Sequence, residues 1–93
     1  MRSVDEFGYD EEPDTESRIR SECEAIADML VAKNRRYGNS ALEPLRVFSR
    51  ADAREQILVR IDDKLSRIRN QHGDDEDAVL DLIGYLVLLR LAQ

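Results

Sequence analysis

The segment from Val79 to Leu91 constrains the fold more than any other, because almost every residue in it is apolar. The apolar residues surround a helix on nearly all sides: Leu80, Leu82, Ile83, Leu86, Val87, Leu88 and Leu89. No run in the chain reaches the roughly 18 apolar residues that a membrane-spanning helix needs. A three-helix subunit of 93 residues is too small to cover such a helix. We therefore expect a homo-oligomer whose interface uses the helix predicted over residues 75–92, with burial inside one subunit as the alternative.

The composition favours a globular helical domain. Hydrophobic residues make up 42% of the chain and charged residues 37%, while two prolines and four glycines are too few to separate many short strands. The net charge of −6 disfavours direct binding to duplex nucleic acid, since the molecule as a whole repels phosphates. A single cysteine cannot form an internal disulfide. With neither a signal peptide nor a membrane span predicted, the expected location is the cytoplasm.

The chain is predicted to be an acidic tail followed by one all-α domain. Residues 1–15 are too charged to collapse and should be disordered, whereas residues 16–93 form the domain. Apolar residues at helical spacing predict three main helices over residues 16–37, 52–71 and 75–92. A connector over residues 38–50 is apolar enough to pack against them, so the expected fold is a helical-bundle oligomer.

The helix ends carry recognisable capping residues. The predicted N-caps are Thr15, Ser49 and Asp74, with Asp52 at the third position of the second helix. Cys23 lies on the apolar stripe of the first helix, so we expect it in the core. No histidine lies near it in sequence to activate the thiol, which argues against a nucleophile.

Asp81 interrupts the apolar pattern of the last helix, one turn before Tyr85. An unpaired buried carboxylate is costly, so Asp81 must be ion-paired, metal-bound or neutral. One interpretation is a structural ion pair or hydrogen bond to an arginine. The other is a functional site.

A row of charged residues on the second helix is the other polar feature: Arg60, Asp63, Lys64 and Arg67. The three cations share one flank beside the apolar stripe and together suit an anion such as a phosphate. The alternative is an ordinary solvated face on which Asp63 pairs with Arg67.

The familiar catalytic motifs are missing from the sequence. It has no glycine-rich phosphate loop, and its single histidine, His72, lies in a predicted turn. Any bound metal is therefore expected to be Mg²⁺ or Mn²⁺ on carboxylates. Asp81 is the main candidate ligand, among a wider set of Glu22, Glu24, Asp28, Asp77 and Asp81. Glu24 and Asp28 point away from the apolar stripe and are expected to face solvent.

Three motifs carry a family resemblance. Residues Lys33–Ser40 (KNRRYGNS) resemble the opening motif of nucleotide modification associated domain type 1, a family common in phages and prophages. Arg60–Ile68 and Asp81–Leu86 are similar to its remaining blocks, and the resemblance covers about residues 20–91. It implies a helical protein linked to nucleotide or DNA-base modification, acting in the cytoplasm of a bacterial host.

A more distant similarity is to the all-α nucleoside triphosphate pyrophosphatases. Asp81 and Tyr85 are spaced as in the last motif of those enzymes. That similarity implies Mg²⁺ held by acids on the first and last helices. Two positions depart from the pattern, because Ala25 stands three residues after Glu22 and Ala78 stands three before Asp81.

The first functional hypothesis is a site for a nucleotide or another phosphorylated nucleoside. Phosphate would be neutralised by Lys33, Arg60, Lys64 and Arg67. Tyr37 would stack on the base near Tyr85, and hydrogen bonds would come from Asn34, Asn39 and Ser40. Asp63 and Asp81 would orient cations or the sugar.

Two alternatives remain open. In one, Mg²⁺ on Asp81 activates water against a triphosphate, which requires three or more carboxylates to converge. A single acid among cations favours binding instead. In the other, the chain is a protein-interaction module, which predicts no pocket at Tyr37 and Lys64.

Overall fold

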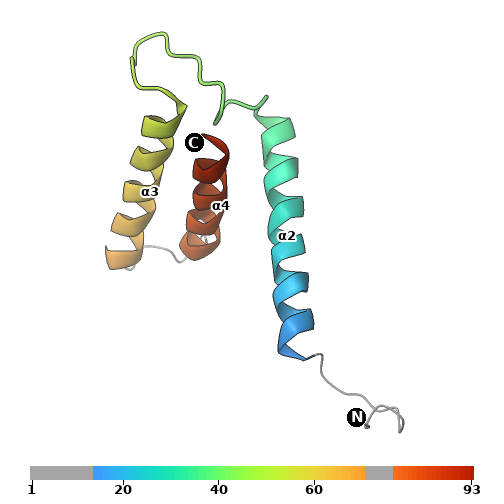
Figure 1. Ribbon diagram of the computed structural model, residues 1–93. Helices are drawn as coiled ribbons and strands as arrows, with labels where there is room; N and C mark the ends of the chain where they lie inside the picture. Colours follow the sequence, from blue (N-terminus) through green and yellow to red (C-terminus); the bar gives the residue numbers. More distant parts are fainter. Residues whose placement is uncertain (1–13, 71–76) are drawn as a thin grey trace, which may run out of the picture.

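The computed structural model describes residues 14–70 and 77–93, which form three α-helices and a connector (Figure 1). Helix α2 spans Thr15–Arg36, α3 spans Ala53–Asn70 and α4 spans Ala78–Leu91. These two ranges contain no strand, which confirms the all-α class. None of the described helices is long and apolar enough to cross a membrane. Most of the predicted tail, residues 1–13, lies outside the described residues.

The N-cap of α2 is Asp14 rather than the predicted Thr15. Asp14 Oδ1 accepts a hydrogen bond from the Ser17 backbone N–H at 2.8 Å, and Thr15 is the first helical residue. The hydrogen bonds from the Ser17 backbone and side chain lower the pKa of Asp14 below its ordinary value of 3.8. The ionised carboxylate therefore suits the N-terminal end of the helix dipole.

The N-caps of α3 and α4 also differ from the predicted ones, and each lies three residues later in the sequence. Asp52 Oδ1 accepts from the Glu55 N–H at 2.9 Å, so Asp52 caps α3, while Ser49 Oγ accepts from the Ala51 N–H at 3.0 Å. Asp77 caps α4 by accepting from the Leu80 N–H at 2.9 Å. Asp74, the predicted cap, precedes the helix start and lies outside the described residues, as does His72. Where several aspartates and serines precede a helix, the cap is the one directly before the first packed turn.

Helices α3 and α4 form an antiparallel pair, and α2 makes a smaller contact with α4 (Figure 1). Within the described ranges the core is small, and its buried side chains come from all three helices: Ile26, Ile57, Ile61 and Ala78. Ile57 is the most buried of them, with 2% of its surface exposed. The described subunit is therefore held together mainly by the packing of α3 on α4, and to a lesser extent by the contact of α2 with α4.

Gly84 lets α2 approach α4. It is buried, and a Cβ atom at this position would lie only 2.9 Å from Leu30 Cδ2 on α2. Glycine in the interior of a helix costs about 1 kcal/mol relative to alanine. Close contact with α2 is the physical reason for a glycine here.

We expect Gly84→Ala to loosen α2 at a net cost in stability of about 0–2 kcal/mol. The added methyl overpacks the crossing by about 1–3 kcal/mol, while alanine returns about 1 kcal/mol of helix propensity. Amide hydrogen exchange should therefore accelerate in α2 and stay unchanged in α3. Leu30→Ala in the same chain should relieve the overlap and slow exchange in α2 again. Unchanged exchange in α2 of the single variant would mean that Leu30 simply rotates away.

The N-terminal half of α2 extends past the α3–α4 pair (Figure 1). At 22 residues α2 is about 33 Å long, against about 21 Å for the 14 residues of α4. Ile19 and Cys23 lie on this projecting half and are exposed, so the expectation that Cys23 belongs to the core is wrong for the subunit. The apolar stripe is continuous in sequence, but the surface that covers it ends near Ile26.

The connector is packed in its first part only. Ala41 and Leu42 are half-buried, and the Asn39 carbonyl accepts hydrogen bonds from the Leu42 and Glu43 N–H groups. The later apolar residues are exposed, contrary to the expectation that they pack down: Leu45, Val47 and Phe48. The connector thus helps to shape the region beside α2 but adds little to the core.

Candidate functional site

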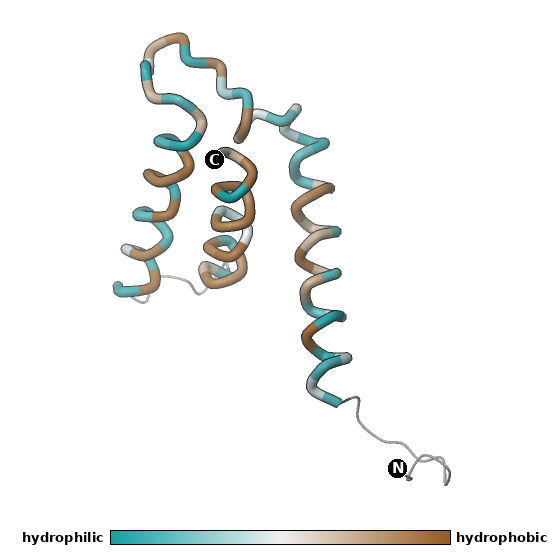
Figure 2. Tube along the Cα trace, viewed as in Figure 1, coloured by the Kyte–Doolittle hydropathy of each residue, from teal (hydrophilic) through white to brown (hydrophobic). Residues whose placement is uncertain are grey.

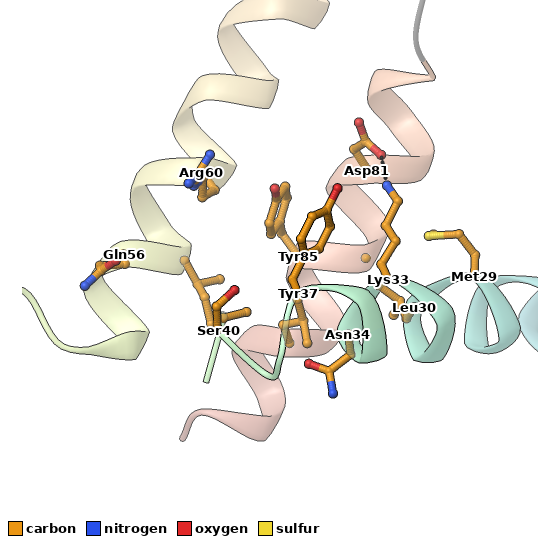
Figure 3. Close-up of a pocket in the computed structure, with 14 residues that line it drawn as sticks. Met29, Leu30, Lys33, Asn34, Tyr37, Ser40, Gln56, Arg60, Asp81 and Tyr85 are labelled. Carbon is orange, nitrogen blue, oxygen red and sulfur yellow. Dashed lines mark ion pairs between the residues drawn. The ribbon is translucent and has the colours of Figure 1, made fainter. Parts of the chain in front are cut away.

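A pocket of about 420 Å³ lies where α2 crosses α4, with α3 as its far wall (Figure 3). In the described residues α2 and α3 do not pack directly on one another, which leaves this space between them. Its apolar lining consists of Met29, Leu30, Ala41, Ile57, Gly84 and Leu88. Its polar lining consists of Lys33, Asn34, Tyr37, Ser40, Gln56, Arg60, Asp81 and Tyr85. The size is within the range of small-molecule sites, about 300–1,000 Å³.

Asp81 joins all three helices at one side of the pocket. Its Oδ1 lies 3.5 Å from Nζ of Lys33 on α2, and its Oδ2 lies 3.3 Å from Nζ of Lys64 on α3. The side chains of Asp81 and Lys64 are only 21% and 13% exposed, so this pairing is partly shielded from water. The carboxylate that interrupts the apolar pattern is thus held by two lysines, not by the arginine expected.

Two tyrosine rings line the pocket. Figure 3 shows the rings of Tyr37 and Tyr85 between Arg60 on one side and the Lys33–Asp81 pair on the other. The Arg36 guanidinium lies 5.6 Å from the centre of the Tyr37 ring, within the range of a cation–π contact. Aromatic faces with cations on either side suit a planar ligand that carries negative charge.

The turn after α2 places Ser40 at the pocket. Gly38 and Asn39 both have positive φ, at 64° and 62°, a conformation that glycine and asparagine adopt most easily. The Asn39 N–H donates to the Asn34 carbonyl at 3.1 Å and so closes the end of the helix. This sharp reversal turns Ser40 back to the pocket. Gly38 and Asn39 therefore form the turn, and Ser40 lines the pocket.

Most of the residues predicted for the site meet in this pocket. Those that line it are Lys33, Asn34, Tyr37, Ser40, Arg60, Asp81 and Tyr85. Lys64 lies beside them through its ion pair with Asp81, whereas Asn39 belongs to the turn. Arg67 Nε and Asp63 Oδ2 are 3.6 Å apart on an exposed part of α3, which matches the solvated-face interpretation of that pair.

Several lining residues were not among the predicted site residues. Met29, Leu30, Ile57 and Leu88 lie on the apolar stripes and carry no polar signal in the sequence. Gln56, whose Nε2 donates to the Ala51 carbonyl at 2.8 Å, likewise resembles an ordinary helix residue. Gly84 is different, because an isolated glycine within a helical pattern often marks a close approach and could have been recognised.

The acidic residues do not form a metal site in the described part of the chain. Asp81 is the single carboxylate among the lining residues, and no group of three or more His, Cys, Asp or Glu in residues 14–70 and 77–93 could hold a metal ion. Glu22, Glu24 and Asp28 lie exposed on α2, as expected for the last two. The arrangement that the residues make is one acid among cations, which does not fit a carboxylate-bound Mg²⁺.

Comparisons with known proteins give no further assignment. No family model, curated protein or solved structure matches this chain.

Proposed function

We propose that this protein binds a nucleotide or another phosphorylated nucleoside in the pocket between α2, α3 and α4. The observation that supports this most strongly is the pairing of two tyrosine rings with Lys33 and Arg60 around one cavity of about 420 Å³. The rings provide faces for a base, and the cations provide partners for phosphate.

The charge of the pocket is opposite in sign to that of the molecule. The chain carries −6 overall, whereas the lining residues include the two cations Lys33 and Arg60 and the single anion Asp81. An anionic ligand is thus attracted to this site and repelled by much of the remaining surface. Arg60 is the stronger phosphate partner, because its planar guanidinium can donate two parallel hydrogen bonds.

The remaining polar groups have roles that follow from their positions. Asn34 and Ser40 offer hydrogen bonds at the end of the pocket beside α2 and the turn. Asp81 fixes the direction of Lys33 through its ion pair, so the carboxylate acts as a positioning group for a cation. It is also an acceptor for ligand hydroxyl groups.

The motif resemblance supports a biological setting for this binding. We propose a phage-type protein associated with nucleotide or DNA-base modification in the bacterial cytoplasm. A Mg²⁺-dependent pyrophosphatase-like hydrolase is the alternative, and it would need carboxylates beyond the one that lines the pocket. A protein-interaction module without a ligand is the second alternative, and it does not account for the pocket.

Binding is tested by titrating the protein with nucleoside mono-, di- and triphosphates and cyclic nucleotides, each with and without Mg²⁺. A ligand at 100 times its Kd should stabilise the fold by about 2.7 kcal/mol, which raises the thermal midpoint by more than ten degrees in so small a domain. Arg60→Ala should weaken binding by about 10- to 100-fold, the value of a charge-assisted hydrogen bond.

Arg69→Ala is the matched control, because Arg69 is also an exposed arginine of α3 but does not line the pocket. The affinity of the Arg69→Ala variant for the nucleotide should stay within about twofold of that of the parent protein. No stabilisation by any nucleotide, or equal losses in the two variants, would exclude the proposed site. Stabilisation that requires Mg²⁺ and is accompanied by release of pyrophosphate would favour the hydrolase.

We also propose that the protein assembles with further copies of itself through α4. The support is the amount of apolar surface that the described subunit leaves exposed, both on α4 and on the projecting half of α2. A core of so few buried side chains is small for an independent domain.

A further inference from the structure

The outward face of α4 is an apolar strip that the described subunit leaves partly exposed. Val79, Ile83, Leu86 and Val87 lie on it, and each is between 37% and 57% exposed. Figure 2 shows that α4 is hydrophobic along nearly its whole length. Asp81, Tyr85 and Leu88 line the pocket instead and therefore belong to another side of the same helix. A partner on the strip would leave the pocket open.

The strip has a spacing that is the same in both directions. Val79, Ile83, Leu86 and Arg90 follow one another at intervals of four, three and four residues, which places them on one side of a helix. Read from the C-terminus, the intervals are again four, three and four. When an identical helix lies antiparallel, Ile83 of each copy therefore faces Leu86 of the other, and Val79 faces Arg90.

We propose that a second copy of this chain packs its α4 antiparallel on this strip, about a twofold axis that passes between Ile83 and Leu86. This inference rests on the self-assembly part of the proposed function and specifies its surface, symmetry and register. A twofold contact requires one patch that complements itself, and the symmetric spacing meets that requirement.

The charge of Arg90 favours the antiparallel arrangement. Arg90 is exposed in the last turn of α4 and lies on the strip. In the antiparallel pair the two Arg90 side chains lie at opposite ends of the contact, whereas a parallel pair would place them side by side. The antiparallel pair also opposes the two helix dipoles favourably.

The flanks of the strip add apolar contacts. In this register Leu82 of each copy lies near Leu89 of the other, and Leu80 lies near Val87. The helix is only about 21 Å long, so the contact falls toward the small end of specific interfaces, near 1,200 Å². We therefore expect dimers that dissociate on dilution.

Sedimentation equilibrium across a wide concentration range tests whether the chain forms a dimer. The parent chain should change from monomer to dimer, and Ile83→Glu should stay monomeric throughout. Val59→Glu is the control, because Val59 is 62% exposed on α3 and away from the strip, so this variant should dimerise like the parent. A parent that is monomeric at every concentration, or equal loss of dimer in both variants, would overturn the proposal.

Disulfide trapping in a Cys23→Ser background tests the register and does not depend on ligand binding. Val79→Cys and Arg90→Cys proteins should cross-link with each other when mixed and oxidised. Each should cross-link poorly alone, because the two copies of either residue lie about 16 Å apart along the antiparallel pair. Efficient cross-linking of Val79→Cys with itself would indicate parallel helices and contradict the proposal.

Nucleotide titration of the Ile83→Glu monomer separates this inference from the binding proposal. Because the strip and the pocket lie on different sides of α4, the monomer should retain its affinity for the ligand if both proposals hold. A protein that binds no nucleotide but forms the mixed cross-link would retain the dimer and lose only the binding function.

Discussion

Replacing Ile57 by alanine is expected to remove a large part of the stability of this subunit. Ile57 is only 2% exposed, and the other buried apolar side chains of the described residues are Ile26, Ile61 and Ala78. Truncating a buried isoleucine to alanine costs about 2–5 kcal/mol, because contacts are lost and a cavity remains. Small domains have only about 5–15 kcal/mol of total stability, and this core is a small one.

Urea unfolding followed by circular dichroism measures this loss. Val59→Ala is the matched control on the same helix, since Val59 is exposed and its truncation should cost about 0.5 kcal/mol or less. Ile57→Val should fall between the two, at about 0.5–1.5 kcal/mol. Similar losses for Ile57→Ala and Val59→Ala would show that the core is not centred where α3 meets α4.

The second large effect is expected for Asp81→Asn, which should destabilise the subunit by about 1–3 kcal/mol and release α2 in particular. The carboxylate pairs with Lys33 of α2 and Lys64 of α3, so its loss weakens two inter-helix contacts at once. A fully buried pair would cost about 3–5 kcal/mol to break, but Lys33 is about half exposed and solvent reduces the effect. Amide exchange should accelerate most in the C-terminal half of α2, which carries Lys33.

Asp63→Asn is the control, because it also removes a carboxylate but breaks no contact between helices. It removes the exposed Asp63–Arg67 pair within α3, which is worth about 0.5 kcal/mol or less. The difference between the two variants should shrink in concentrated salt, since screening weakens the pairs of the parent protein. Equal stability of the two variants would mean that Asp81 does not hold the helices together.

The number and type of the helices followed from the sequence. Each predicted segment has apolar residues at helical spacing, and this local pattern determines which residues can be helical whatever they pack against. The exact starts were less certain, because Asp14 and Thr15, or Asp74 and Asp77, are all good caps. The choice among good caps one to three residues apart depends on which turn packs against the other helices, and the local sequence pattern does not determine that packing.

Much of the pocket was also predictable, because its polar residues stand in short motifs. Lys33, Asn34, Tyr37 and Ser40 lie within eight residues, and one turn of helix separates Asp81 from Tyr85. Arg67 lies outside the lining because it stands about two turns farther along α3 than Arg60, and Asp63 pairs with Arg67 there. The apolar lining residues could not be told from core residues, since both appear as the same stripe.

The sequence by itself determined that this protein is helical, that its last helix is apolar all round, and that Asp81 needs a partner. Only the tertiary structure decided that the partners are Lys33 and Lys64, that Cys23 is exposed, and which side of α4 stays uncovered. The physical reason is one of range. Helix formation is a local property of consecutive residues, whereas pairing and burial depend on where one helix crosses another, and here that point is fixed by Gly84.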